Sequence, residues 1–148
     1  MSGVKIIVQN KKAYYNFAIE DEIEAGIMLV GSEVKSLREG KANINDAYVS
    51  EEKGELYLTN AMITEFKGAN RFNHEPRRKR KLLLHKKEMT KIIGKMAVKG
   101  LSLVALKMYF KNGKVKVLLG LAKGKKLHDK RETLKKKDEM RRAARGED

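Results

Sequence analysis

The chain has 148 residues, with 34 Lys and Arg against 19 Asp and Glu, so its formal net charge at pH 7 is +15. This length fits one domain with one hydrophobic core. Cysteine is absent, which excludes a disulfide framework, a thiol nucleophile and a Cys-ligated zinc site. No apolar run approaches the ~20 residues of a membrane-spanning helix, and residues 1–5 lack the pattern of a signal peptide. We therefore expect a cytoplasmic protein without a membrane partner.

The positive charge is concentrated in the second half of the chain. Residues 1–66 contain seven bases and eleven acids, whereas residues 77–99 contain ten bases and one acid. Residues 123–148 add eleven bases against six acids. This large excess of bases over acids predicts binding to a polyanion, because phosphate groups neutralise positive charges that otherwise repel one another. A solvated, solubilising run of charge is the alternative.

Several short segments have the composition of β-strands. Residues 14–30 are rich in β-forming side chains, and a turn at residues 51–54 separates the segments 47–50 and 55–63. Short strands at hairpin spacing are typical of a small closed barrel or a sandwich. The expected fold class is therefore mostly β with helices (α+β).

The clearest hairpin joins residues 101–111 to residues 114–121 through Asn112-Gly113, a pair that tolerates the positive φ of a two-residue turn. Alternation predicts which side chains of the first strand share the inward face: Val104, Leu106, Met108 and Phe110. The matching face of the second strand is expected to carry Val115, Val117, Leu119 and Leu121. Lys107, Lys114 and Lys116 then point away from the core.

Two helices are expected. The longer one is predicted to start at Pro76, which suits a first helical turn, and to follow an apolar period of about 3.6 from Leu82 to Gly100. The shorter one is predicted over residues 32–39, with Ser32 as its N-cap and Gly40 just beyond its end.

The last 26 residues, 123–148, differ from the rest. They offer little apolar surface, but Asp129 and Glu132 resemble a capping box, and favourable i,i+4 charge pairs follow. We predict a tail that is disordered when free and helical on a polyanion, attached to an RNA-binding β domain over residues 1–122. A frayed terminus of no consequence is the alternative.

Signals for catalysis are few. The three histidines lie in separate segments without ligand spacing, so no metal or other cofactor is expected. Asp21, Glu33 and Lys35 could together hold a metal ion and activate water for phosphodiester cleavage, which leaves a nuclease as the enzymatic alternative. Otherwise the chemistry is that of binding: lysines and arginines for phosphates, with Phe72 as the best side chain to stack on an unpaired base.

Six motifs in order carry a resemblance to a known family. They are Asn10-Lys-Lys-Ala13, Glu24-Ala-Gly-Ile27, Glu33-Val-Lys-Ser-Leu-Arg38, Gly40-Lys-Ala-Asn43, Arg80-Lys-Leu-Leu-Leu-His85, and Gly124-Lys-Lys126 followed by Asp129-Lys-Arg131. In this order and spacing the chain resembles the small protein B (SmpB) family, from about Asn10 to Arg131. The resemblance implies an oligonucleotide-binding-type β-barrel with flanking helices and a basic C-terminal tail.

The resemblance also implies partners and a function. Such proteins bind the tRNA-like domain of transfer-messenger RNA (tmRNA) and bring it to stalled ribosomes for rescue and for tagging of the nascent chain. The tail is expected to occupy the empty mRNA channel near the decoding centre, against ribosomal RNA. The implied protein is a monomeric adaptor and not an enzyme. A structural ribosomal protein, which would be a permanent component of the ribosome, remains a third class.

The resemblance assigns candidate residues by motif. The tmRNA-facing candidates are Asn10, Lys11, Glu24, Lys35, Arg38, Arg80, Lys81, Lys116 and Lys123. The tail candidates for ribosome binding are Gly124 as a hinge, Lys125, Lys126, Asp129 as a helix cap, Lys130 and Arg131. Glu24 repels phosphates, so it can help only by accepting from a base amino group, a 2′-OH or a basic side chain. Tyr15 stands where the family often has His, which puts any imidazole contact in doubt.

Overall fold

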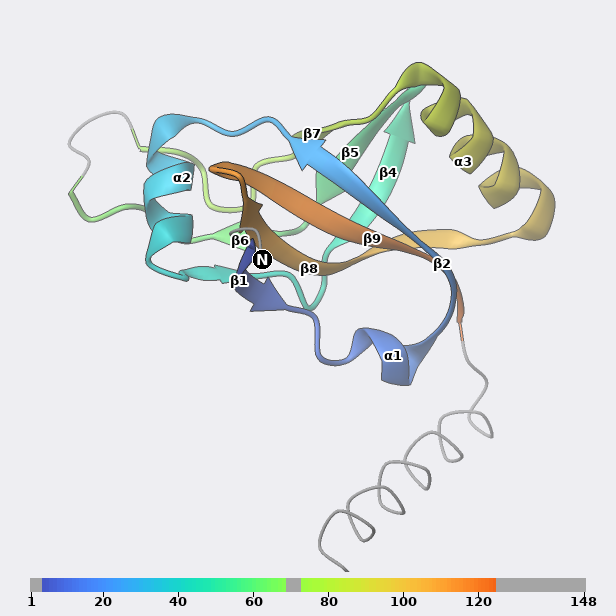
Figure 1. The fold of residues 1–148 in the computed structure, drawn as a ribbon, viewed down its shortest axis with the longest axis horizontal. Helices are drawn as coiled ribbons and strands as arrows, with labels where there is room; N and C mark the ends of the chain where they lie inside the picture. Colours follow the sequence, from blue (N-terminus) through green and yellow to red (C-terminus); the bar gives the residue numbers. More distant parts are fainter. Residues whose placement is uncertain (1–3, 69–72, 125–148) are drawn as a thin grey trace, which may run out of the picture.

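The computed structural model describes residues 4–68 and 73–124, and most of these residues belong to one antiparallel sheet that closes into a barrel (Figure 1). Around the ring the strands follow the order β8, β4, β5, β7, β2 and β9, and β9 pairs again with β8. β1 pairs with the second half of β8. The strands of this sheet are β1 (Val4–Gln9), β2 (Phe17–Ile27), β4 (Tyr48–Glu52), β5 (Glu55–Thr59), β7 (Arg80–Leu83), β8 (Ser102–Lys111) and β9 (Lys114–Gly124). The prediction of a mostly β fold with a closed barrel is confirmed.

Three helices and a small two-stranded sheet complete the described part of the chain. They are α1 (Ala13–Asn16), α2 (Gly31–Arg38), α3 (Lys86–Lys99), β3 (Ala42–Asn43) and β6 (Met62–Ile63). Figure 1 shows α2 and α3 at opposite sides of the barrel, with β2 and β9 crossing between them. No helix among the described residues is long and apolar enough to cross a membrane.

The barrel interior holds the main hydrophobic core. Among its fully buried members are Leu37, Ile44, Leu56, Leu58, Ile63, Leu82, Leu103, Met108, Val117, Leu119 and Leu121. A second, smaller cluster forms where α1 covers one end of β8, and it contains Ala13, Val104, Leu106 and Ala122. β8 thus contributes side chains to two separate apolar clusters.

A bulge in β8 explains this division and corrects one prediction. Ala105 faces Leu119 and Lys107 faces Leu118, so Leu106 is an extra residue in the ladder. One extra residue reverses the alternation, because the side-chain period of a strand is two. Val104 and Leu106 consequently pack with α1 and not beside Met108. The prediction of one shared face from residue 104 to residue 110 is wrong.

The other half of the hairpin follows the prediction. Asn112 and Gly113 adopt positive φ values of 52° and 77°, as a two-residue turn of this kind requires. The apolar side chains of β9 line the main core, as expected: Val115, Val117, Leu119 and Leu121. β9 continues to Gly124, which pairs with Phe17 of β2.

The long helix begins ten residues later than its sequence suggests. Pro76 lies in an irregular segment, and Arg80–Leu83 forms β7, in which Lys81 faces Tyr57 and Leu82 faces Ile27. The adjacent apolar residues of this segment fit the period of a helix as well as that of a strand. The segment forms a strand because it pairs with β2 and β5 of the barrel. Leu82 is then buried in the core, whereas Leu83 is 48% exposed. Gly100, with φ of 64°, ends α3 as predicted.

The start of α2 also differs by two residues. Val30, and not Ser32, occupies the cap position, and its N–H donates to Oε1 of Glu33 at 2.9 Å. The hydroxyl of Ser32 instead lies 2.9 Å from Nδ1 of His74, which ties the helix to a distant loop. Gly40, just past the helix, has φ of 70° and fits the predicted termination.

Candidate nucleic-acid interface

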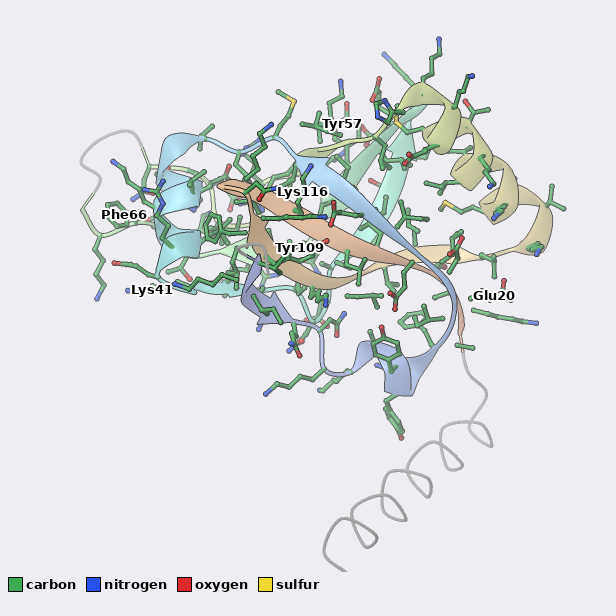
Figure 2. The ribbon with its side chains drawn as sticks, in the orientation of Figure 1. Glu20, Lys41, Tyr57, Phe66, Tyr109 and Lys116 are labelled. Carbon is green, nitrogen blue, oxygen red and sulfur yellow. The ribbon has the colours of Figure 1, made fainter. Side chains whose placement is uncertain are left out.

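Three neighbouring strands bring charged side chains together on the outside of the barrel. Lys116 of β9 faces Tyr109 of β8 on one edge and Gly26 of β2 on the other. Because strands alternate their faces, Glu24 lies on the same outer side as these residues. We call the set Glu24, Tyr109, Lys111 and Lys116 the outer barrel face. Figure 2 shows Tyr109 and Lys116 close together beside β9.

Glu24 is held by two side chains of β8. The hydroxyl of Tyr109 donates a short hydrogen bond to Oε2 of Glu24. Nζ of Lys111 lies 3.3 Å from the same oxygen and 3.4 Å from Oε1. Glu24 therefore accepts from a neighbouring basic side chain, which is one of the roles open to it. The hydrogen bond from Tyr109 to Glu24 was not predicted from the sequence.

These contacts favour the charged form of Glu24. The Tyr109 hydrogen bond has the largest effect and lowers the pKa of Glu24; partial burial raises it, and Lys111 and Lys116 lower it further. The net pKa lies below the ordinary value of 4.5. Burial first, and then the Glu24 carboxylate, raise the pKa of Tyr109. At neutral pH the pair is a carboxylate and a neutral phenol.

A groove adjoins Glu24 and Lys116. Its volume is about 420 Å³, and it is lined by Glu24, Gly26, Leu83, Leu84, His85, Glu88 and Lys116. A Cβ at Gly26 would lie 3.2 Å from Cβ of Leu83, so glycine lets Leu83 pack closely over β2. The groove combines an exposed leucine with a cation and a carboxylate, which suits a partner that has both apolar and polar edges.

The motif Glu33-Val-Lys-Ser-Leu-Arg38 divides into two faces of α2. Glu33, Ser36 and Leu37 are buried, at the i, i+3, i+4 spacing of one helix face. Lys35 and Arg38 are exposed on the other side. Nζ of Lys35 lies 5.7 Å from the centre of the Phe66 ring. Half of the motif is therefore structural, and the two predicted RNA-facing cations are accessible.

Arg80 does not belong to any surface. Its side chain is completely buried, and it donates to Glu33, to the carbonyl of Ala61 at 2.9 Å and to the carbonyl of Pro76 at 3.0 Å. Burial lowers the pKa of Arg80, and the Glu33 carboxylate opposes that effect. A phosphate cannot reach this guanidinium. The prediction that Arg80 binds RNA phosphates is wrong, because the residue supports the barrel from within.

Asn10 and Lys11 flank a second groove of about 400 Å³, beside Tyr14, Glu22 and Lys107. Nδ2 of Asn10 donates to the carbonyl of Ala105 at 3.0 Å, and only 6% of the residue is exposed. Within the described residues, Oδ1 of Asn10 has no partner. Lys11 is exposed. Asn10 is thus a nearly buried part of the wall of this groove.

The structure describes three of the remaining predicted residues: Lys81, Lys123 and Gly124. Lys81 lies on β7, where its Nζ is 3.6 Å from a carboxylate oxygen of Glu55. Lys123 and Gly124 end β9 and are exposed. The tail candidates Lys125, Lys126, Asp129, Lys130 and Arg131 lie outside the described residues, as does the stacking candidate Phe72.

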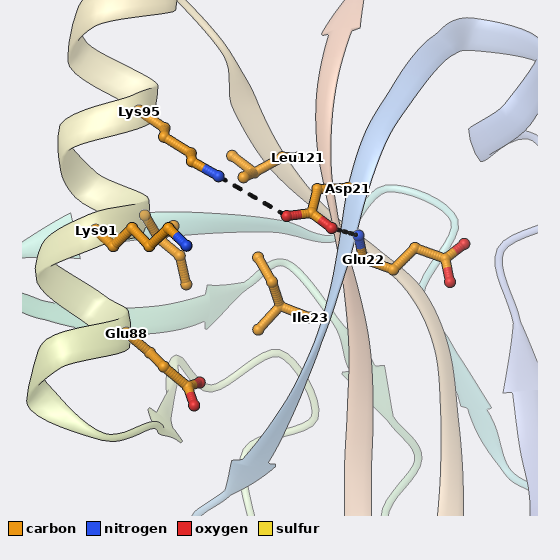
Figure 3. A pocket seen from close by; sticks show the side chains of 8 residues that line it. Asp21, Glu22, Ile23, Glu88, Lys91, Lys95 and Leu121 are labelled. Atoms are coloured by element: carbon orange, nitrogen blue, oxygen red, sulfur yellow. Dashed lines mark hydrogen bonds and ion pairs between the residues drawn. The ribbon is translucent and has the colours of Figure 1, made fainter.

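The acids proposed for a nuclease are not assembled. Asp21 lies at the seam between β2 and α3, with its carboxylate 3.9 Å from Nζ of Lys95 (Figure 3). Glu33 is enclosed on α2, where Arg78 and Arg80 contact its two carboxylate oxygens. Residues 4–68 and 73–124 contain no group of three or more possible metal ligands. The alternative in which Asp21, Glu33 and Lys35 hold one metal ion is therefore not supported, since Asp21 and Glu33 pair with different cations.

Sequence reasoning missed Tyr109 and Lys111 as partners of Glu24, and Arg78 as a partner of Glu33. The hairpin register around Asn112-Gly113 could have placed Tyr109 opposite Lys116. Nothing in the local sequence places Glu24 beside them, since that contact depends on the pairing of β2 with β9 across more than 80 residues.

Comparison with known proteins gives the family of this chain. The family model described as "SmpB protein" matches residues 7–147. The SsrA-binding protein of Rickettsia typhi is 63% identical over 135 residues, covering 90% of this chain and 89% of the relative. The SsrA-binding protein of Geobacter sulfurreducens is 56% identical over 142 residues, covering 96% of this chain and 93% of the relative.

A solved structure shares the fold. It is described as "tmRNA-SmpB: a journey to the center of the bacterial ribosome", with a TM-score of 0.68 and 50% sequence identity over 81% of this chain and 85% of that one. Identity above 50% over nearly whole chains, a family match from residue 7 to residue 147 and the shared barrel agree. The chain belongs to the SmpB protein family.

Proposed function

We propose that this protein is a non-enzymatic, cytoplasmic RNA-binding adaptor of ribosome rescue. It binds the tRNA-like domain of tmRNA and carries it to ribosomes stalled on an mRNA without a stop codon. There the nascent peptide is extended with a tag for degradation. The observation that carries the proposal is the outer barrel face, where Lys111 and Lys116 lie beside a fixed Glu24 carboxylate in a member of the SmpB family.

The chemistry of this face fits a structured RNA. Lysines neutralise phosphates and release counterions, and they do so for any sequence. A carboxylate repels phosphates and binds only where the RNA presents a donor, such as a base N–H. A face with both groups therefore favours an RNA whose exposed base edges match its phosphate positions. The relatives named SsrA-binding proteins support the choice of tmRNA, which is also called SsrA RNA.

The proposal divides the chain into two parts. Residues 1–122 bind tmRNA, with Asn10, Lys11, Lys35, Arg38 and Lys81 as further contacts, and Lys123, where the tail begins, adds one more. Residues 123–148 bind the ribosome: they enter the empty mRNA channel near the decoding centre and contact ribosomal RNA. Their excess of bases over acids is the support for this second role. The similarity to a structure described as tmRNA-SmpB in the bacterial ribosome supports it as well.

A translation reaction on an mRNA without a stop codon tests this function. Ribosomes, tmRNA and the full chain are combined, and the proposal predicts a tagged peptide that is absent when the chain is left out. The intactness of tmRNA after incubation with the chain and Mg²⁺ is measured in parallel. Cleaved tmRNA would indicate a nuclease. Stoichiometric presence of the chain in vacant ribosomes would indicate a structural ribosomal protein.

A further inference from the structure

Tyr109 connects the barrel wall to the Glu24 carboxylate of the outer barrel face. The residue is 5% exposed, and its hydroxyl reaches across β9 to Oε2 of Glu24 on β2. A buried phenol has few ways to rotate, so it fixes the oxygen to which it donates. Lys111 also contacts Glu24, but it is long, flexible and 40% exposed. Tyr109 is therefore the rigid partner of Glu24.

The carboxylate retains free acceptor positions. An ionised carboxylate has about four lone-pair directions, of which Tyr109 takes one and the longer contacts from Lys111 take up to two more. The Glu24 side chain is 36% exposed and lines the groove that also holds Lys116. Glu24 thus lines the groove beside a cation that suits a phosphate. One bound nucleotide could contact Lys116 through its phosphate and Glu24 through its base.

We propose that Tyr109 is a positioning residue that holds the Glu24 carboxylate in one orientation, in which it accepts hydrogen bonds from the N–H edge of an unpaired base bound beside Lys116. The inference rests on the proposed function and deepens it, since it explains how the face distinguishes one RNA from another. Without the tyrosine hydroxyl the carboxylate keeps the contact with the flexible Lys111 but loses its rigid partner, and the donor edge of the base loses a prepared acceptor. The cations remain, so attraction to phosphates in general is unchanged.

Among the described residues, charged and titratable side chains face Glu24 from several elements. Lys111 faces it from β8 and Lys116 from β9. His85, just before α3, and Glu88, in the first turn of α3, line the same groove. The titration must therefore be resolved for Glu24 alone, because a second carboxyl, that of Glu88, lines the same groove. Nuclear magnetic resonance of the side-chain carboxyl carbons supplies it.

The first experiment uses the full chain without RNA. Tyr109→Phe removes one hydroxyl and keeps the ring, and the pKa of Glu24 is expected to rise toward its ordinary value. Tyr48→Phe, which removes the hydroxyl of an exposed tyrosine on β4, should leave that pKa unchanged. An unchanged Glu24 pKa in Tyr109→Phe would overturn the positioning role, whatever the RNA partner proves to be.

The second experiment measures tmRNA binding by Tyr109→Phe, Glu24→Gln and the double variant. Each single variant is expected to bind tmRNA about tenfold more weakly, as the loss of one charge-assisted hydrogen bond implies. The double variant should bind no more weakly than Glu24→Gln, because the hydroxyl acts through the carboxylate. The salt dependence of binding should not change, since no cation is removed.

The outcomes separate the two proposals. Additive losses in the double variant, or a weaker salt dependence in Tyr109→Phe, would refute the positioning role while tmRNA binding stands. If the unmodified chain binds tmRNA no better than other RNA, the proposed function fails, and the carboxyl titration alone still decides whether Tyr109 controls Glu24.

Discussion

Glu33 and Arg80 lie 47 residues apart in the chain, yet they form an ion pair in which neither side chain has any exposed surface. The pair joins α2 to β7, and Arg80 extends the connection to the carbonyls of Ala61 and Pro76. A buried charge needs a partner for every donor and acceptor. This pair therefore fixes the position of α2, and with it the direction of the exposed Lys35 and Arg38.

Replacing Arg80 by Met should destabilise the fold severely. The change leaves the buried Glu33 carboxylate with Arg78 as its remaining cation, and the expected loss in the free energy of unfolding is about 3–5 kcal/mol. The matched control is Arg38→Met on the exposed face of α2, expected to change stability by no more than about 0.5 kcal/mol. Urea denaturation followed by circular dichroism measures both. Equal stabilities of the two variants would show that Arg80 is not a structural residue.

The Glu33 carboxyl should make stability depend on pH. Burial raises the pKa of Glu33, but hydrogen bonds from Arg78, the Val30 N–H and Arg80 outweigh burial, and the net pKa lies below 4.5. The unfolded state then binds its proton at higher pH than the folded state. The stabilisation is complete above about pH 4.5 and is lost as the pH falls through the lower folded value.

Comparison of the unmodified chain with Glu33→Gln between pH 7 and pH 3 measures this contribution. The variant should be less stable at pH 7, and the difference between the two proteins should shrink as the pH falls. A difference that stays constant over this range would mean that Glu33 does not carry the charge in the folded state.

Lys116→Ala should weaken binding to tmRNA and reduce the salt slope by about one contact. The side chain lines the groove beside Glu24. Among the described residues it forms no ion pair with a carboxylate, so its charge is available to a phosphate. Lys53→Asn is the control: it removes one charge from the β4–β5 turn and keeps a residue that tolerates the positive φ of 51°. An unchanged slope for Lys116→Ala would remove this residue from the interface.

The hairpin of β8 and β9 shows how far sequence reasoning reached. The turn at Asn112-Gly113 and the inward face of β9 were predictable, because turn chemistry and alternation are local properties. The bulge at Leu106 was not, since an inserted residue leaves the composition of the strand unchanged. Because of this bulge, Val104 and Leu106 belong to the smaller apolar cluster and not to the main core.

The candidate site shows the same limit. Its lysines were predictable from charge and motif, but Arg80 has the same charge as an RNA-binding residue and is buried. Only the tertiary pairing of Arg80 with Glu33 distinguishes the two roles. The contact between Tyr109 and Glu24 depends in the same way on strands that are distant in the chain. Residue types can be assigned to a site from sequence, whereas their partners require the fold.

Removing residues 125–148 should separate the two proposed activities. The cut follows Gly124, so the whole of β9 and its pairing with β2 are kept. Affinity for tmRNA is expected to change by less than threefold, whereas tagging on stalled ribosomes should fall to background. Gel-shift binding and the tagging reaction measure the two activities on the same preparation. Parallel loss of both would refute the division of the chain into a tmRNA-binding and a ribosome-binding part.

The most direct test is a competition between tmRNA and bulk tRNA for the full chain, at about 0.15 M salt, where attraction to phosphates in general is weakened. A chain with a net charge of +15 binds any RNA at low salt, so only the ratio of the two affinities is informative. We expect a strong preference for tmRNA that Glu24→Gln reduces. Equal affinity for the two RNAs would contradict it and leave a basic surface without selectivity.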